Sequence, residues 1–446
     1  MKIQINMPQG AKEIIKKLHI YDFEAFVVGG CVRDTILGKN PKDWDITTNA
    51  KPQNIMDIFD GHRMVNIGEK HGTISIFCID KYYEVTTYRI DGEYSDNRRP
   101  SFVKFTDNIK EDLQRRDFTI NAMAYNDNLG IVDCFNGIND LKNGIIRCVG
   151  NCEERFNEDY LRIIRAYRFA AVLNFSLSDD IVDFTIKNCD KLKDVAAERI
   201  QQELVKLITS ENFDKIQLFF DHCAAVLFPE IENLKNFEQN NPFHCYDVYE
   251  HSLNVMQNTP SNISLRLAAL LHDTGKFFTK TIDKDGCFHF YGHAKVSVDI
   301  AKSFMKHWRF DNLTTHNVTT IIAYHDIDII ADISQLKKLL GKLGKVMLGY
   351  VITFQKADNM AKTSLADKKL QNILAAEALL KEIIAKDEPT RISDLAINGE
   401  DIMAYLDLPS SPKIGKILNN ILEQVIENPK LNDKSSLIAL LNSYLD

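Results

Sequence analysis

An apolar run that ends at a glycine pair and leads into two aspartates constrains the fold of this chain most. Residues 26–28 (FVV) stop at Gly29-Gly30, which predicts a buried strand followed by a tight turn. Residues 31–37 can then form a helix that ends at Gly38. The first part of the chain is therefore expected to combine strands and helices around this turn.

The segment Asp43-Trp44-Asp45-Ile46 follows this helix. In an extended strand, alternate side chains point the same way, so Asp43 and Asp45 would lie side by side while Trp44 and Ile46 face the core. Two carboxylates this close repel one another unless a cation lies between them. Mg²⁺ suits such a pair, because it binds one or two carboxylates and completes its shell with water and substrate phosphate oxygens.

An exposed Asp-x-Asp occurs by chance in many proteins and is weak evidence by itself. The glycine turn and the arginine that precede it strengthen the metal-site interpretation. Gly30 would let a triphosphate approach the backbone, and the helix start and Arg33 favour negative charge. Residues 83–87 predict a neighbouring strand that carries a further carboxylate, Glu84. The stretch therefore predicts a metal and triphosphate site, with an ordinary strand and surface turn as the alternative.

A chain of 446 residues is too long for one core, so two to four domains are expected. We find no run of about eighteen apolar residues and no signal peptide. The nine cysteines are scattered, which predicts reduced thiols and a cytoplasmic protein.

The net charge of −8 requires any nucleic-acid contact to come from a local basic surface. The candidates for such contacts are Lys187, Lys191, Lys193 and Arg199, and further along the chain Lys337, Lys338, Lys342 and Lys345.

Residues 158–170 predict one helix that carries an aspartate and three arginines at a spacing of three, namely Asp159, Arg162, Arg165 and Arg168. A salt-bridged surface helix is the ordinary interpretation. The alternative is base recognition, because a carboxylate accepts hydrogen bonds and a guanidinium donates them. An Asp–Arg pair would match the amino group and ring nitrogen of cytosine or adenine, whereas uracil and guanine present the reverse order. Arg165 and Arg168 could hold phosphates.

Five segments occur in a characteristic order: GGCVRD, PKDWDITT, RRDFTINAMA, FNEDYLRIIRAYRFA and AAERIQQEL. Together they resemble the class II tRNA nucleotidyltransferase and bacterial poly(A) polymerase family over about the first half of the chain. The resemblance implies that a primer 3′-hydroxyl attacks the α-phosphate of CTP or ATP with Mg²⁺ present, and that pyrophosphate leaves.

The resemblance also implies a role for each matching residue. Asp43 and Asp45 would bind the catalytic metals, and Asp159 with Arg162 would read the base. The remaining nucleotide contacts would be Gly30, Arg33, Arg116, Arg165 and Arg168. The pair Glu198-Arg199 would cap the helical neck of the molecule.

Eight of the twelve histidines fall within residues 244–325. A histidine on an apolar helix is more often a core residue than a ligand, but several here recur at expected helix ends beside aspartates. Imidazole and carboxylate ligands without thiolates suit Mn, Fe, Co, Ni or Mg. His251, His272-Asp273 and Asp358 resemble the H…HD…D signature of the HD phosphohydrolases. That resemblance implies metal-dependent phosphate-ester hydrolysis, with His293 and His325 at a second metal or a phosphate.

These observations predict an α+β fold, with a mixed sheet in a nucleotidyltransferase head followed by helical regions. The expected divisions are a head (1–147), a base-recognising neck (148–210), a helical body or linker (211–240), an HD-like domain (241–362) and a tRNA-binding helical tail (363–446).

Three functions stay open on the sequence alone. The first is template-independent addition of CCA to the 3′ end of tRNA from CTP and ATP, with a second phosphohydrolase activity. The polar stretch 91–100 favours it, because family members that add only CC resemble this pattern but lack that loop. The second is a poly(A) polymerase. The third is an HD hydrolase whose head only binds RNA, which the intact Asp43 and Asp45 disfavour.

Overall fold

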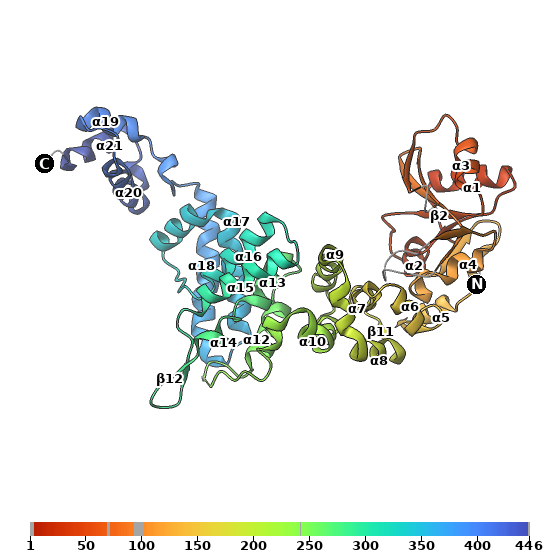
Figure 1. Cartoon of the computed structure of the whole chain (residues 1–446). Coiled ribbons are helices and arrows are strands. Elements are labelled where there is room, and N and C mark those ends of the chain that lie inside the picture. Colours follow the sequence, from red (N-terminus) through yellow and green to blue (C-terminus); the bar gives the residue numbers. More distant parts are fainter. Residues whose placement is uncertain (1–3, 69–71, 93–101, 241, 445–446) are drawn as a thin grey trace. The chain divides into compact units, whose positions relative to one another are not determined.

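The computed structural model describes residues 4–68, 72–92, 102–240 and 242–444 (Figure 1). The chain forms two compact units, Met1–Phe228 and Pro229–Asp446. The boundary between them falls inside the segment 211–240 that the sequence assigned to a body or linker. Most of the loop predicted at 91–100 lies outside the described residues.

The first unit is built on a mixed sheet, as predicted. Among the described residues its strand order is β3-β4-β5-β2-β1-β8-β9. These strands are β1 (Ala25–Val28), β2 (Asp45–Thr48), β3 (Met64–Gly68), β4 (Thr73–Cys78), β5 (Lys81–Thr87), β8 (Met123–Asn126) and β9 (Gly130–Asp133). All four residues of β1 are buried, because it lies inside the sheet, between β2 and β8. Strand β2 pairs with β1 in the antiparallel sense and with β5 in the parallel sense.

The helices and short strands around this sheet complete its framework. They are α1 (Gln9–Ile20), α3 (Pro52–Ile58), α4 (Ile109–Gln114), α5 (Gly137–Asn143), β6 (Arg89–Asp91), β7 (Val103–Phe105), β10 (Ile145–Ile146) and β11 (Ser176–Leu177). Helix α1 packs against β1, β4 and α3. Its buried positions recur at the spacing of one helix face, which explains why this amphipathic segment covers the sheet.

The predicted strand, turn and helix are present. Strand β1 ends at Val28, Gly29 takes φ +80°, and α2 spans Gly30–Ile36. A positive φ at this value is accessible to glycine and strained for other residues, so the turn depends on Gly29. One detail of the prediction was wrong, because β2 begins at Asp45 and Asp43 precedes it.

The helix predicted over residues 158–170 is two helices. Helix α6 (Cys152–Glu158) ends one residue before Asp159, whose backbone is extended at φ −154° and ψ 101°, and α7 (Leu161–Leu173) follows. The Asp159 carboxylate accepts a hydrogen bond from the Leu161 amide at 3.2 Å, a local bond that competes with helix continuation. Three further helices follow, α8 (Asp179–Asn188), α9 (Ala197–Ile208) and α10 (Phe213–Leu227).

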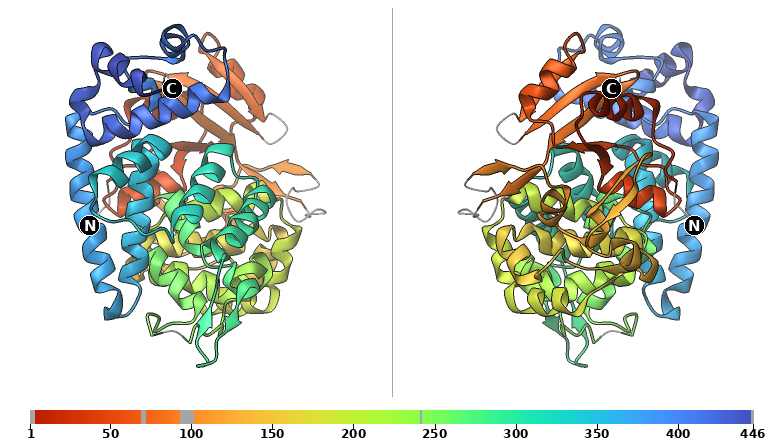
Figure 2. Two further views of the ribbon diagram at one scale, coloured as in Figure 1. Left: turned by 90° about the vertical axis from the view of Figure 1, so that its left-hand side faces the viewer. Right: turned by 90° about the vertical axis from the view of Figure 1, so that its right-hand side faces the viewer.

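The second unit is mainly helical. Its elements are α11 (Pro229–Glu232), α12 (Val248–Asn258), α13 (Ile263–Leu271), α14 (Lys276–Thr279), β12 (Thr281–Ile282), β13 (Phe288–His289), α15 (His293–His307), α16 (Asn312–Tyr324), α17 (Ile333–Met360), α18 (Asp367–Lys386), α19 (Gly399–Leu406), α20 (Pro412–Glu427) and α21 (Lys434–Leu441). The long helices α17 and α18 pack side by side (Figure 2). Within the described residues, no helix has the length and apolar content needed to cross a membrane.

One predicted RNA contact was wrong. Lys337 is 2% exposed, and its ammonium group donates to the Ile426 carbonyl at 2.9 Å and pairs with Glu388 at 2.7 Å. It therefore joins α17 to α20 and to the segment after α18, and it is not available to a nucleic acid. Its neighbour Lys338 is half exposed and pairs with Glu423 at the surface.

We expect Lys337→Ala to destabilise the second unit by about 2 kcal/mol, because it leaves a buried carbonyl and a partly buried carboxylate without their partner. Thermal unfolding of the full chain measures this effect. Lys338→Ala is the matched control and should change stability by no more than about 0.5 kcal/mol. Equal effects of the two substitutions would contradict the structural role of Lys337.

Candidate active site

One cavity of about 800 Å³ in the first unit is lined by all nine residues that the sequence assigned to the metal and nucleotide. They are Gly30, Arg33, Asp43, Asp45, Arg116, Asp159, Arg162, Arg165 and Arg168. The glycine turn, the start of β2, the segment before Phe118 and the start of α7 meet here. Residues separated by more than a hundred positions therefore form one site.

Acidic side chains gather at the β2 side of this cavity. Ile46 pairs with Val85 across β2 and β5, which brings Glu84 beside Asp45. Burial raises the pKa of the Asp45 carboxyl; the charge of Glu84 and then that of Asp43 raise it further, and Arg116 opposes them. Carboxylates that disfavour one another's ionisation fit a divalent cation, whose charge would relieve the repulsion. Asp43 and Asp45 would hold it.

Arginines cover the other side of the same cavity close to the glycine turn. Arg33 donates to the Asn121 side-chain oxygen at 2.6 Å and pairs with Asp34 at 2.7 Å. A Cβ atom at Gly29 would lie 3.1 Å from Nη1 of Arg116, whereas one at Gly30 would meet Arg33 only at 3.6 Å. The absence of a side chain at Gly29 therefore allows Arg116 to reach the turn. Two guanidinium groups in fixed positions can bind the oxygens of a triphosphate.

The arginines of α7 are held by carboxylates from outside that helix. Arg165 pairs with Asp117 at 2.7 Å and with Glu203 of α9 at 3.2 Å, and Arg168 pairs with Glu203 at 2.8 Å. The guanidinium of Arg168 also lies 3.4 Å from the centre of the Phe169 ring. Burial alone would raise the pKa of the Asp117 carboxyl, but the charge of Arg165 and the bond from Asn121 hold it below its ordinary value. The arginines are thus fixed in place before any ligand binds.

Asp159 and Arg162, which were predicted to read the base as a pair, each bind a different residue in the structure. Asp159 binds Arg199 of α9, with Nη1 at 3.1 Å from Oδ1 and Nη2 at 2.7 Å from Oδ2. Arg162 donates to Glu158 at 2.6 Å and to the Arg155 carbonyl at 2.8 Å. Both side chains line the cavity, but each is oriented by another residue. The sequence assigned Arg199 to the neck and offered it as an RNA contact, and it missed the bond to Asp159.

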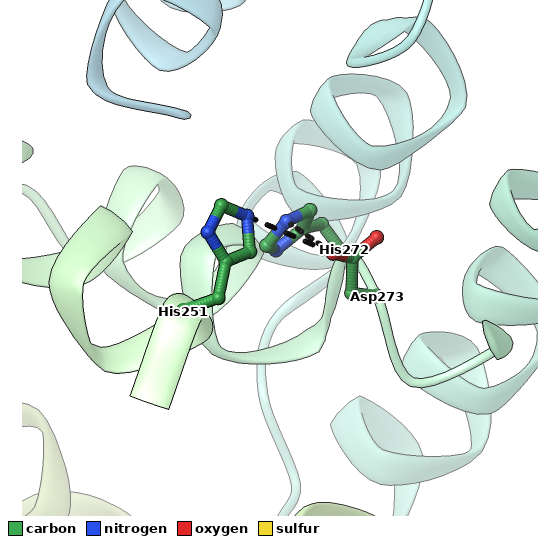
Figure 3. Close-up of side chains that lie close together, drawn as sticks. All are labelled: His251, His272 and Asp273. Atoms are coloured by element: carbon green, nitrogen blue, oxygen red, sulfur yellow. Dashed lines mark ion pairs between the residues drawn. The ribbon is translucent and has the colours of Figure 1, made fainter. Parts of the chain in front are cut away.

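A second cluster lies in the second unit, in a cavity of about 290 Å³. His272 and Asp273, which follow α13, line this cavity, and His251 of α12 lies beside them (Figure 3). One oxygen of Asp273 lies 3.1 Å from Nε2 of His272 and 3.7 Å from Nε2 of His251. The other oxygen lies 3.4 Å from Nε2 of His293 and 3.9 Å from that of His325. The six predicted residues are therefore brought together, because Asp358 is 3.0 Å from His251.

Three of these imidazoles are oriented in the same way. His272, His293 and His325 place Nδ1 at 2.9, 2.9 and 2.7 Å from the carbonyl three residues earlier. A hydrogen on Nδ1 leaves the Nε2 lone pair directed into the cavity, which is how metal-binding histidines are commonly fixed. Burial lowers the pKa of His325 to about 3 and so keeps it neutral. Nε2 of His272 is buried and lies 3.1 Å from an Asp273 oxygen, in a geometry that makes no hydrogen bond. This arrangement fits two ligand atoms of one metal ion.

Two lysines that the sequence analysis missed balance the carboxylates of this cluster. Lys276 binds Asp273 at 2.7 Å and Lys362 binds Asp358 at 2.6 Å. Burial acting alone would raise the pKa of Asp358, but the Lys362 charge and the bond to His251 hold it well below its ordinary value. The sequence did indicate these ion pairs, because Lys276 and Lys362 follow Asp273 and Asp358 by about one helical turn.

Three family profiles match the chain. Residues 25–147 match the "Poly A polymerase head domain", residues 174–235 the "Probable RNA and SrmB- binding site of polymerase A", and residues 289–441 tRNA nucleotidyltransferase domain 2. Together with the mixed sheet and its acidic, arginine-lined cavity, they define this protein as a nucleotidyltransferase.

Two relatives extend this assignment along the whole chain. The CCA-adding enzyme of Streptococcus suis (strain 05ZYH33) is 30% identical over 445 residues, which cover 99% of this chain and 98% of the relative. That of Ligilactobacillus salivarius (strain UCC118) is 30% identical over 455 residues, with 99% and 98% covered. This chain belongs to the class II CCA-adding enzymes, which confirms the resemblance of its first half to the class II tRNA nucleotidyltransferases. The resemblance of the histidine-rich segment to the HD phosphohydrolases stays a prediction.

Solved structures agree with the fold. The crystal structure of the Bacillus stearothermophilus CCA-adding enzyme in complex with CTP is 26% identical, covers 98% of this chain and 97% of that chain, and has a TM-score of 0.72. The Thermotoga maritima CCA-adding enzyme complexed with tRNA is 19% identical, covers 98% and 94%, and has a TM-score of 0.56. The predicted α+β fold, a mixed sheet followed by helices, is therefore confirmed.

Asp45→Asn tests whether the acidic pocket is built for a cation. Without metal, the pKa of Asp45 in the folded protein is raised above its ordinary value of 3.8. The stability that protonated Asp45 contributes is therefore present below pH 3.8 and is lost as the pH rises through the raised pKa. The metal-free variant should therefore be at least as stable as the wild type near neutral pH. Added Mg²⁺ should raise the melting temperature of the wild type and not that of the variant.

The control for this experiment is Asp57→Asn, which changes an exposed carboxylate on α3 outside the cavity. It should keep the response to Mg²⁺. An equal response of the Asp45 variant would exclude Asp45 as a cation ligand.

Proposed function

We propose that this chain adds C, C and A in turn to the 3′ end of tRNA, with CTP and ATP as substrates and no nucleic-acid template. The observation that carries this proposal is the single cavity that contains both the acidic pair at β2 and the Asp159–Arg162 pair at α7. The Bacillus relative bound to CTP and the Thermotoga relative bound to tRNA support the same substrates.

The residues of the cavity divide the work between the reacting phosphates and the base. Asp43 and Asp45 hold divalent metal, which in this family is typically Mg²⁺. Two such ions, when bound, would activate the attacking hydroxyl and stabilise the leaving oxygen. The triphosphate would bind at Gly30, Arg33 and Arg116. Arg165 and Arg168 complete the nucleotide contacts.

Base selection follows from hydrogen-bond direction. The Asp159 carboxylate accepts from the amino group of cytosine or adenine, and Arg162 donates to the adjacent ring nitrogen. Uracil and guanine would place a donor against the guanidinium and an acceptor against the carboxylate. Unpaired polar groups of this kind are costly in a desolvated site, so UTP and GTP are rejected.

Sequencing the products made on a tRNA that lacks its CCA end, with all four nucleotides present, tests this function. We expect addition of C, C and A followed by a stop. A long tail of A would contradict the proposal and support the poly(A) polymerase alternative. Absence of any addition, with RNA binding retained, would support the hydrolase alternative.

We propose a second activity for the histidine cluster, namely metal-dependent hydrolysis of phosphate esters such as 2′,3′-cyclic or 2′-phosphate RNA ends. The observation that favours it is that Asp273 belongs to two groups of three metal-binding side chains. His251, His272, Asp273 and Asp358 would hold one metal. His293 and His325 would hold a second metal or the substrate phosphate. A transition metal (Ni, Mn, Co or Fe) or Mg²⁺ suits these ligands.

Asp273→Ala should abolish this hydrolysis, because it removes an oxygen from both groups of ligands, while nucleotide addition continues. Asp45→Ala should have the opposite effect and serves as the matched variant. Hydrolysis of a 2′,3′-cyclic nucleotide in the presence of each metal and extension of truncated tRNA are the two measurements. Loss of both activities in either variant would refute independent sites.

The five-part division of the chain, with tRNA bound by the tail from residue 363 onward, stays a prediction and is part of this proposal. The proposed cytoplasmic location rests on nine cysteines that are all free thiols. Reduced thiols are typical of that compartment.

A further inference from the structure

The environment of Asp159 determines how many hydrogen bonds this residue can still accept. Its Oδ1 atom accepts from the Leu161 amide at 3.2 Å and from Arg199 Nη1 at 3.1 Å. Its Oδ2 atom accepts from Arg199 Nη2 at 2.7 Å. A carboxylate has about four acceptor positions, so three are filled and one remains on Oδ2.

The bond to Arg199 also fixes the plane of the carboxylate. A guanidinium that binds both oxygens sets the orientation of its partner, which a single ammonium group does not. Arg199 and Asp159 are both largely buried, with side chains 23% and 15% exposed. Arg199 does not itself line the cavity, so it acts from behind the carboxylate.

We propose that Arg199 is a positioning residue for base selection, which acts by leaving Asp159 one acceptor in one fixed direction. This inference rests on the proposed role of Asp159 in reading the base. One fixed acceptor matches one amino hydrogen, which cytosine and adenine both offer. A carboxylate that is free to turn could also accept the ring N–H of uracil or guanine.

Helix α9 is suited to this task because it orients several nucleotide-binding side chains at once. Arg199 and Glu203 lie four residues apart, on the same face of α9. Glu203 is buried and binds Arg165 and Arg168, while Arg199 binds Asp159. Two side chains of α9 with opposite charges therefore each bind complementary side chains that line the cavity.

The test is the selectivity of Arg199→Gln and Arg199→Lys. Rates of single-nucleotide addition are measured for CTP against UTP on tRNA that lacks CCA, and for ATP against GTP on tRNA that ends in CC. We expect Arg199→Gln to lower both selectivities by about tenfold, within the range that a bidentate base contact contributes. Arg199→Lys keeps the charge but not the two-point contact, so its selectivity should be intermediate.

Arg147→Gln is the matched control, because it removes an arginine that pairs with a buried aspartate, Asp140, in the same unit and outside the cavity. It should leave selectivity unchanged. Melting temperatures of all variants are measured in parallel. If Arg199→Gln does not fold, the Arg199→Lys selectivity decides. Slower addition of all four nucleotides with unchanged selectivity would overturn the inference and leave Arg199 a purely structural residue.

Asp159→Asn separates this inference from the function on which it rests. If that variant keeps its preference for C over U, Asp159 does not read the base and the proposed function is at fault. If Asp159→Asn changes the preference and the Arg199 variants do not, Asp159 reads the base without help from Arg199. The inference then fails and the proposed function stands.

Discussion

The antiparallel register between β1 and β2 is the constraint on which the first unit depends. It places Val28, the last residue before the glycine turn, opposite Asp45. A shift by one residue would turn every side chain of β2 to the other face of the sheet and carry Asp45 away from the cavity. The fully buried side chains of β1 prevent such a shift, since their burial holds the strand in place. Core packing and the position of the Asp45 carboxylate in the cavity are therefore fixed by the same contacts.

In both units, several buried charged side chains are paired with side chains of opposite charge. In the first unit, Glu203 lies between Arg165 and Arg168. In the second, each of two aspartates binds a lysine. Removal of one member of such a pair leaves an uncompensated charge, which costs more than the pair itself contributes. Preformed pairs also mean that little reorganisation is needed when a ligand arrives.

Much of the fold and the composition of the site could be predicted from the sequence, because short-range patterns carry them. The run before Gly29 indicated the strand and turn, and ordered motifs indicated which side chains share the cavity. The break at Asp159 was not predicted, because helical periodicity continues through it, whereas the Asp159 side chain bonds to the Leu161 amide and to Arg199 in the folded chain. The burial of Lys337 and the pairing of Arg199 with Asp159 depend on helices that meet only in the folded chain. Periodicity has no information about such contacts.

The two adjacent glycines of the opening turn are constrained unequally. At Gly29 the backbone has φ +80° and Arg116 lies close by, whereas at Gly30 the backbone is helical and the space for a Cβ atom is ordinary. The conformation and packing of the protein itself therefore require glycine at the first position, whereas at the second only the approach of a ligand would exclude a side chain. A pair that looks like one motif in the sequence therefore holds two glycines that are needed for different reasons, the first for the turn and the second for the ligand.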